Sequence, residues 1–260
     1  MEPHAFIAEV YRRMSLRQPA DREVPDWEEV RKDPTVMRVI EEVRPLLPSD
    51  KNSVILDIGF GNGWFIAACI SLRYTSISGA DFGIANKKHV QQWSTSVVGL
   101  HEIRSNIGEF LADKQEQFDF IHLSHVLEHI PKYSLLYVVD ALYAALTRGG
   151  TVLLRVPNME GPCANSSYYV TLAHEYGFTG SNLFSLLSIC NFNDIRFHQL
   201  SESKRSPKQL AGRLLRWPIL KWNAARHRLF GVNYGGQFGT ELVVTAKRGD
   251  LPALFDPRYR

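Results

Sequence analysis

The length and composition of this chain exclude several classes of protein. Its 260 residues fit one large domain, or one domain with appendages, and a hydrophobic fraction of 45% excludes an intrinsically disordered chain. The formal net charge of +3 is too small to indicate a polyanionic partner. Because no familiar recognition element is present either, we expect no binding of nucleic acid.

The cysteines and the apolar runs bear on the cellular compartment. Cys69, Cys163 and Cys190 are widely spaced, which argues against a disulfide framework and a zinc cluster and fits a reducing cytoplasm. The first residues lack the basic region and the long apolar core of a signal peptide. No run of about eighteen apolar residues occurs, so we expect a cytoplasmic protein without a membrane span.

Hydrophobic periodicity predicts an alternation of strands and helices along the chain. Residues 1–50 form a polar-rich helical appendage that ends at Pro48. We expect strands at residues 53–58, 76–81, 97–103, 118–123, 151–157, 193–201 and 240–248. Helices are expected at about residues 63–73, 85–94, from about 126, at 134–147 and at 180–190. The alternation predicts an α/β domain over residues 51–250, with a seven-stranded, mostly parallel sheet covered by helices on both faces, and a tail at 251–260.

A glycine-rich stretch follows the first predicted strand. Residues 54–65 read Val-Ile-Leu-Asp-Ile-Gly-Phe-Gly-Asn-Gly-Trp-Phe. Gly59, Gly61 and Gly63 allow the backbone to approach a ligand closely because they have no Cβ. A strand, a tight loop and a helix start in this order form the place where open α/β sheets bind nucleotide-like cofactors. A tight connection without a ligand is the alternative.

The spacing of the glycines excludes two kinds of cofactor site. The dinucleotide pattern Gly-x-Gly-x-x-Gly requires glycine where this chain has Trp64 or Ile66. The phosphate-binding loop Gly-x4-Gly-Lys-Ser/Thr is absent as well. We therefore do not expect a pyrophosphate or triphosphate as the ligand. Asp81 ends the second predicted strand, where an acid can accept hydrogen bonds from both ribose hydroxyls of a cofactor, although it could also cap a helix.

Four segments together resemble the class I S-adenosylmethionine-dependent methyltransferases. They are the residues 56–63 around the glycines, Asp81, the run Phe-Asp-Phe-Ile-His-Leu-Ser-His-Val-Leu-Glu-His-Ile at 118–130, and Arg-Gly-Gly-Thr-Val-Leu-Leu at 148–154. The resemblance extends over residues 50–200 and implies a Rossmann-like sheet with S-adenosylmethionine as cofactor. The runs 124–130 and 174–179 are also similar to a subgroup that accompanies polysaccharide biosynthesis, and to quinone-ring methyltransferases.

The resemblance implies a role for each matching cofactor residue. The methionine end of the cofactor would be held by Asp57 and the backbone of Gly59, Phe60, Gly61 and Gly63. Asp81 would bind the ribose, with Phe82 beside the adenine. Asn106 and Ile107 occupy the place where the family contacts adenine, often with an aspartate. Ser124 and His125 would lie near the sulfonium methyl group.

Several side chains are candidates for a general base. A sulfonium is an activated methyl donor, so the protein must chiefly align the reacting atoms, and a base would assist a hydroxyl acceptor. We expect His174 in this role first and His125 next, with His129 and Glu175 as further candidates. His129 could share a helix face with His125, or it could be structural. Two histidines and Glu128 could also indicate a metal, but without further convergent carboxylates we expect none.

The acceptor and the partners are the least constrained part of the sequence. Tyr168 and Tyr169 could line an acceptor pocket within the long irregular stretch 159–179, or belong to a loop packed on the sheet. The subgroup resemblance favours O-methylation of a saccharide or a lipid-linked glycan intermediate. A quinone or another small aromatic acceptor is the second interpretation, and a catalytically inactive partner protein that binds the cofactor is the third.

A basic, tryptophan-containing segment stands apart from the predicted domain pattern. Residues 203–230 are rich in lysine and arginine and contain no Asp or Glu, and Trp217 and Trp222 lie among them. This insertion, which we extend to residues 203–236, could bind an anionic membrane surface from the cytoplasm. It could instead cover a bulky acidic substrate, or pack an apolar face on the protein core.

Overall fold

The computed structural model describes residues 26–161, 164–199 and 239–252, and in addition residues 9–10, 218–219, 221–222, 225 and 229. Most of the first 25 residues and most of the insertion 203–236 therefore lie outside the described residues, as do residues 253–260. The predictions for the insertion and for the tail are not tested by the structure.

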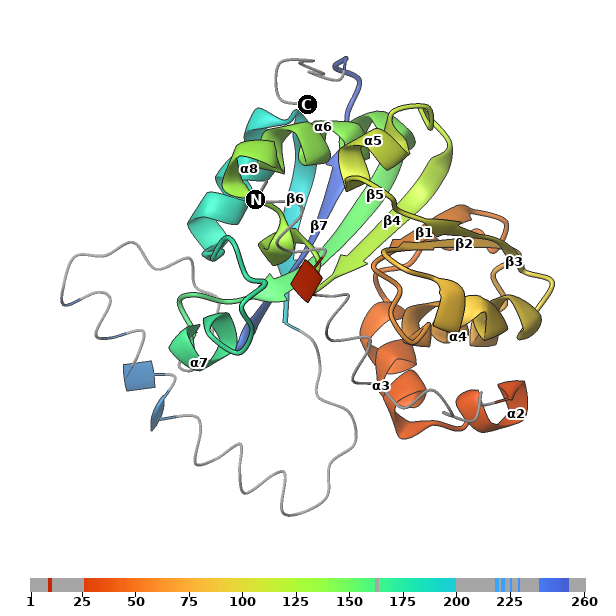
Figure 1. Ribbon diagram of the computed structural model, residues 1–260. Coiled ribbons are helices and arrows are strands. Elements are labelled where there is room, and N and C mark those ends of the chain that lie inside the picture. The colour runs from red at the N-terminus through yellow and green to blue at the C-terminus, as the bar shows by residue number, and fades with distance from the viewer. Residues whose placement is uncertain are drawn as a thin grey trace.

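The described chain contains a mixed, mostly parallel sheet of seven strands in the order β3-β2-β1-β4-β5-β7-β6 (Figure 1). Only β7 is antiparallel, both to β5 and to β6. The strands are β1 (Val54–Ile58), β2 (Ser76–Asp81), β3 (Val97–Glu102), β4 (Phe118–Ser124), β5 (Leu146–Pro157), β6 (Phe192–His198) and β7 (Glu241–Arg248). The predicted α/β fold and all seven predicted strands are confirmed.

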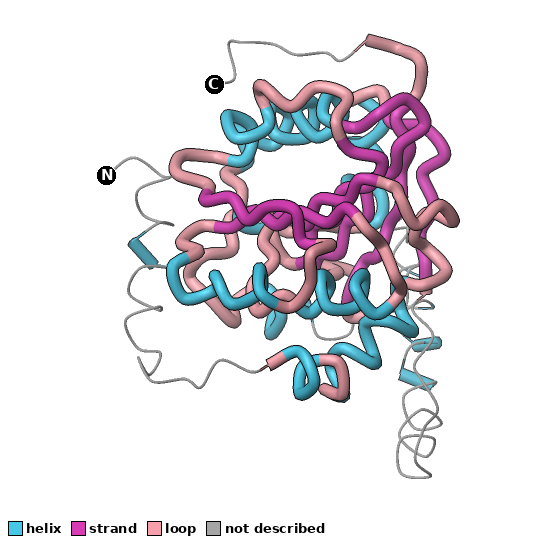
Figure 2. Tube along the Cα trace, turned by 90° about the vertical axis from the view of Figure 1, so that its right-hand side faces the viewer, coloured by secondary structure: helices cyan, strands magenta, loops and turns pink. Residues whose placement is uncertain are grey.

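The helices cover both faces of this sheet. They are α2 (Trp27–Val30), α3 (Pro34–Val43), α4 (Trp64–Ser71), α5 (Ile107–Leu111), α6 (Leu135–Ala145), α7 (Ala164–Tyr168) and α8 (Gly180–Ile189), with 3-10 helices η1 (Ala85–Gln92), η2 (Leu127–His129) and η3 (Lys132–Ser134). One core lies between the sheet and α5, α6 and α8, and the other between the sheet and α2, α3 and α4. Figure 2 shows the strands between these two layers of helices.

The central strands are mostly apolar because both of their faces are covered. In β1, Leu56 and Ile58 enter the core under α6, while Ile55 enters the core under α4. Alternate residues of one strand thus pack into opposite layers of the core. Asp57 is buried among these apolar side chains with 2% of its surface exposed, and it points into the same layer as Ile55.

The N-terminal helices form part of one of the two layers. Asp33 begins α3, because its side chain accepts a hydrogen bond from the backbone N–H of Thr35 and Pro34 follows at the first helical position. Val36, Ile40 and Val43 lie one helical turn apart on a single face and are buried against α4. The predicted helical character of residues 27–43 is confirmed, and this segment packs directly on the sheet domain.

The segment after β4 differs from the sequence-based expectation. Instead of a regular helix from about residue 126, the chain forms only the 3-10 turn η2. Pro131 ends it, because a proline disfavours the helical conformation of the residue before it, and Ile130 is extended. His125 also has a left-handed backbone with φ of +55°. The expectation that His125 and His129 share one face of a helix is therefore wrong.

Among the described residues, none of the helices has both the length and the apolar character needed to cross a lipid bilayer.

Gly59 lies where the segments that follow β1 and β4 pass close to each other. Its φ is +72°, and a Cβ there would lie 2.3 Å from Cγ2 of Val126, the second residue after β4. We predict that Gly59→Ala lowers the free energy of unfolding by about 1–2 kcal/mol for the left-handed backbone, and by about 1–3 kcal/mol more for the overpacked contact.

Urea unfolding measures this change, and Gly149→Ala is the matched control. Gly149 has a φ of +74°, but a Cβ there would have no neighbour within 4 Å. The control should lose only the backbone contribution. Equal losses in the two variants would contradict a steric role for Gly59.

Candidate functional site

The glycine loop between β1 and α4 lies at the carboxyl ends of the parallel strands. The N–H of Gly59 donates to the carbonyl of Ala80 in β2 at 2.7 Å, which fixes the start of the loop against the neighbouring strand. Gly63, with φ of +79°, precedes the first turn of α4 and provides no side-chain cap. The loop therefore presents backbone and no side chain at its three glycines.

Asp81 and Gly61 form the open part of this loop. The N–H of Gly61 donates to Oδ2 of Asp81 at 2.8 Å, so the carboxylate at the end of β2 lies directly beside the glycine backbone. A Cβ on Gly61 would meet only the carbonyl of Gly59, at 3.9 Å, so the space in front of it is open. The side chain of Phe82 follows and is 43% exposed. An acid beside open backbone at the end of a strand is the arrangement with which dinucleotide folds hold a ribose.

Asp57 is paired inside the protein. Its Oδ1 lies 2.7 Å from Nδ1 of His122, the residue directly opposite it in the register of β1 and β4. The imidazole of His122 in turn stacks on Phe65 of α4, with ring centroids 3.8 Å apart. The pair compensates the burial of a carboxylate, which would otherwise be strongly unfavourable. Any contact of Asp57 with a cofactor must come in addition to this bond.

Asn106 and Ile107 begin α5 beyond the end of β3. Oδ1 of Asn106 accepts a hydrogen bond from the N–H of Glu109 at 2.8 Å and caps the helix. A carbonyl oxygen has a second lone pair, so this cap leaves room for a further donor such as an exocyclic amine. The side chain of Ile107 is buried in the core. Both adenine contacts expected from the sequence stay predictions.

His125 lies between two carboxylates immediately after Ser124 and the end of β4. Its Nδ1 is 3.1 Å from Oε1 of Glu128, and its Nε2 is 2.9 Å from Oε1 of Glu241 in β7. These two hydrogen bonds outweigh the effect of burial and raise the pKa of His125 to about 9. The imidazole is therefore positively charged at neutral pH.

The same network continues to the N-terminal helices. Nε of Arg155 in β5 donates to Glu241 at 2.8 Å, and its Nη1 donates to Glu42 of α3 at 2.9 Å. Burial alone would raise the pKa of Glu241, but the hydrogen bond from His125 and the charge of Arg155 outweigh it and lower that pKa to about 2. The carboxylate of Glu241 thus stays ionised at neutral pH and lies between the two cations.

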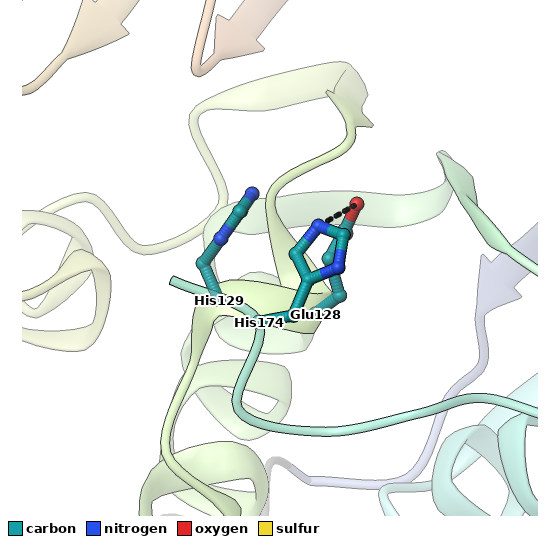
Figure 3. A group of neighbouring side chains, drawn as sticks. All are labelled: Glu128, His129 and His174. Atoms are coloured by element: carbon teal, nitrogen blue, oxygen red, sulfur yellow. Dashed lines mark ion pairs between the residues drawn. The ribbon is translucent and has the colours of Figure 1, made fainter. Parts of the chain in front are cut away.

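A second cluster brings together Glu128, His129 and His174 (Figure 3). Nδ1 of His129 donates to the carbonyl of Ala173 at 2.9 Å, and Nδ1 of His174 donates to the carbonyl of Tyr168 at 2.8 Å. The two rings lie 4.8 Å apart between centroids, and Nε2 of His174 is 4.0 Å from Oε1 of Glu128. Burial lowers the pKa of His129, although its hydrogen bond to the carbonyl of Ala173 acts in the opposite direction.

Three further sequence candidates lie near this cluster. The N–H of Glu175 donates to the carbonyl of Glu128 at 2.8 Å, but its carboxylate is not part of the cluster. The ring of Tyr168 lies 5.9 Å from that of His174 and 5.1 Å from that of Tyr169. Tyr169 is 79% exposed. Tyr168 is the last residue of α7 and Tyr169 follows it, so the aromatic pair lies at the end of this helix, with the ring of Tyr168 near His174.

Several residues of this region were missed from the sequence. Glu42, Arg155 and Glu241 carry no local motif, because their contacts join α3, β5 and β7 across the whole chain. The pairing of His122 with Asp57 could have been predicted from the sequence. Each is the second-last residue of its predicted strand, so the two lie opposite each other if these strands are parallel neighbours.

A family model described as a methyltransferase domain matches residues 27–194. No curated protein matches the chain at a significant level.

Solved structures share the fold at low sequence identity. A methyltransferase of Burkholderia thailandensis that acts on 1,6-didemethyltoxoflavin, solved with S-adenosylhomocysteine, has a TM-score of 0.57 at 19% identity over 96% of this chain and 92% of its own. An S-adenosylmethionine-dependent methyltransferase of Archaeoglobus fulgidus has a TM-score of 0.56 at 17% identity over 82% and 94% of the two chains. A possible histamine N-methyltransferase of Thermotoga maritima has a TM-score of 0.55 at 15% identity, over 95% of this chain and 100% of its own.

The match of the family model covers more than half of the chain, and it includes the glycine loop, Asp81 and the residues after β4. The chain therefore belongs to the methyltransferase-domain family, as a class I enzyme whose cofactor is S-adenosylmethionine.

Proposed function

We propose that this enzyme transfers the methyl group of S-adenosylmethionine to a hydroxyl group of a saccharide or of a lipid-linked glycan intermediate. The observation that carries the proposal is the pair of imidazoles beside Glu128, one from His129 in η2 after β4 and one from His174 after α7. A hydroxyl is a weak nucleophile at neutral pH, so an acceptor of this kind benefits from basic groups at the site of transfer.

The cofactor supplies the activated methyl group, and the protein holds the cofactor and the acceptor in the orientation for transfer. The open space at Gly61 and the carboxylate of Asp81 beside it support binding of the adenosine part of the cofactor here. Alignment of nucleophile, methyl carbon and sulfur accounts for a large part of the barrier reduction in such reactions. The rigid attachment of the loop to β2 through Gly59 and Ala80 supports this alignment.

The positive charge on His125 argues against this residue as the general base. With a pKa of about 9, its imidazole already carries a proton at neutral pH and cannot accept another. His174 and His129 each donate Nδ1–H to a backbone carbonyl, so in both rings Nε2 carries the lone pair that can accept a proton. We assign the role to His174, because its ring also lies beside the exposed aromatic pair.

The aromatic pair Tyr168 and Tyr169 supports a ring-shaped acceptor. Aromatic faces stack on the apolar face of a sugar, and they stack equally on a quinone or another small aromatic molecule, which is our second candidate. Structural neighbours named for toxoflavin and N-acetylserotonin methylation carry the same fold, so the fold itself does not select the acceptor. We further propose that residues 203–230 bring the enzyme to an anionic membrane surface if the acceptor is lipid-linked.

The first prediction concerns cofactor affinity. Asp81→Ala removes the carboxylate that we assign to the ribose, and hydrogen bonds to a charged group contribute about 1.5–3 kcal/mol each. We expect binding of S-adenosylhomocysteine to weaken at least about tenfold in isothermal titration calorimetry. Asp113→Ala removes an exposed carboxylate paired with Lys114 and should leave the affinity unchanged. Undiminished binding in Asp81→Ala would refute the ribose assignment.

The second prediction concerns turnover. His174→Ala should lower the rate of methyl transfer by about 10²–10⁴-fold because a base is lost, while binding of S-adenosylhomocysteine is retained. The assay follows a labelled methyl group into extracted glycolipid, nucleotide sugars and quinone precursors in parallel. His198→Ala, which removes a histidine of the edge strand β6 that is bonded to Thr245 and lies outside the cluster, is the control. Transfer into none of these acceptors by the wild type would favour a catalytically inactive partner protein.

The third prediction concerns pH and stability. The folded-state pKa of His125, about 9, lies above its ordinary value of 6.5, so its contribution to stability is complete below pH 6.5 and is lost as the pH rises through 9. His125→Asn keeps a residue that tolerates the left-handed backbone but removes the charge. We expect the difference in urea midpoint between wild type and variant to be largest below pH 6.5 and to shrink above pH 9. A constant difference would contradict the charged network.

A further inference from the structure

We propose that Glu128, His129 and His174 bind a divalent metal ion, and that this ion positions the acceptor oxygen of the proposed reaction (Figure 3). The metal site stands on the geometry of these three residues alone. Its role toward the acceptor rests on the proposed function.

The three side chains converge on one point. They project in the same direction from η2 and from the segment after α7, and their ligand atoms all lie within 4.8 Å of one another (Figure 3). Neighbouring ligands of a tetrahedral or octahedral ion, each about 2.1 Å from it, lie about 3.0–3.4 Å apart. Side-chain rotations that bring the most distant atoms about 1.5 Å closer would therefore complete the site.

Both imidazoles already have the orientation of metal ligands. A histidine that binds a metal through one nitrogen almost always donates its other N–H to a carbonyl or a carboxylate, which fixes the tautomer and the ring. His129 makes this bond to Ala173 at 2.9 Å and His174 makes it to Tyr168 at 2.8 Å. In both rings Nε2 is consequently the nitrogen with a lone pair, and Nε2 of His174 lies 4.0 Å from Oε1 of Glu128.

Glu128 provides an independent observation. It is 1% exposed, and its Oε2 has no hydrogen-bond partner within the described part of the chain. A buried carboxylate oxygen without a partner is strongly unfavourable, and a bound cation would compensate it. Oε1 of Glu128 is held by Nδ1 of His125 at 3.1 Å, as metal-binding carboxylates are usually held by a neighbouring donor.

The backbone fixes the two halves of the cluster relative to each other. The carbonyl of Glu128 accepts hydrogen bonds from the N–H groups of Glu175 at 2.8 Å and Tyr176 at 3.1 Å. The residue that follows His174 is thus bonded to the residue that precedes His129. This double attachment keeps the ligand atoms together without an ion, so the site is preformed.

The ligand set indicates the kind of ion. Two imidazoles and one carboxylate suit Zn²⁺, Mn²⁺ or Fe²⁺ better than Mg²⁺ or Ca²⁺, which prefer oxygen ligands. Three protein ligands leave coordination positions open for an acceptor. A hydroxyl bound there has a lowered pKa and loses its proton to solvent. Its oxygen then bonds to the methyl carbon as the carbon–sulfur bond breaks, and S-adenosylhomocysteine leaves. With the ion bound, His129 and His174 are its ligands, and the ion takes over the role that we assign to His174 as a base in the metal-free site. His174→Ala then lowers turnover because a ligand is lost.

The test titrates the tag-free full chain, freed of metal with a chelator, with ZnCl2 and with MnCl2 in a calorimeter. We expect one saturable site per chain for at least one of the two ions. Glu128→Gln, His129→Ala and His174→Ala should each weaken it about tenfold or more. His198→Ala and His101→Ala, which remove histidines outside the cluster, should bind like the wild type. Co²⁺ as a substitute should give visible absorption bands that disappear in His174→Ala.

Two outcomes overturn the metal site. One is the absence of saturable binding of either ion to the wild type, and the other is unchanged affinity in all three cluster variants. Binding of S-adenosylhomocysteine, measured in the same samples, shows that each variant is folded and separates the two ideas. Normal cofactor binding without metal binding refutes the metal site alone. A wild type that binds metal but transfers no methyl group to any hydroxyl acceptor refutes the proposed function and leaves the metal site standing.

Discussion

Parallel pairing of β1, β2 and β4 is the constraint on which the site depends. Because these strands run in the same direction, their carboxyl ends meet at one edge of the sheet, and the glycine loop, Asp81 and His125 all follow such ends. Helices cover both faces, so the edge is the place where polar groups can meet a ligand. The close contact of Gly59 with Val126 shows how little room separates the two loops there.

Two polar networks lie beside each other in the region that follows β4. His125 is bound by Glu128 and Glu241, and through Glu241 and Arg155 it is connected to the N-terminal helix α3. This network is charged, and we assign it the role of holding the segment after β4 in place. The cluster of Glu128, His129 and His174 brings its ligand atoms within 4.8 Å of one another, and that is where we place the chemistry. Glu128 belongs to both networks, so its carboxylate joins the structural and the reactive parts of the site.

The sequence was sufficient for the cofactor half of the site and insufficient for the acceptor half. The glycine loop is a local motif, in which strand, turn and helix follow within a dozen residues, and all seven strands were recognised from their apolar runs. The helix expected after β4 failed because Pro131 and the left-handed His125 override the hydrophobic pattern. With it failed the idea that His125 and His129 act from one helix face.

What the sequence determined by itself was the α/β alternation, the glycine loop and the acid at the end of β2, because each depends on neighbours along the chain. What the tertiary structure decided was which of the histidines are charged and which are basic. That depends on partners far apart in sequence, such as Glu241, 116 positions from His125, and the carbonyls of Ala173 and Tyr168. A carboxylate beside a histidine raises its pKa, and a carbonyl fixes its tautomer. Only the fold brings either of them within hydrogen-bond distance.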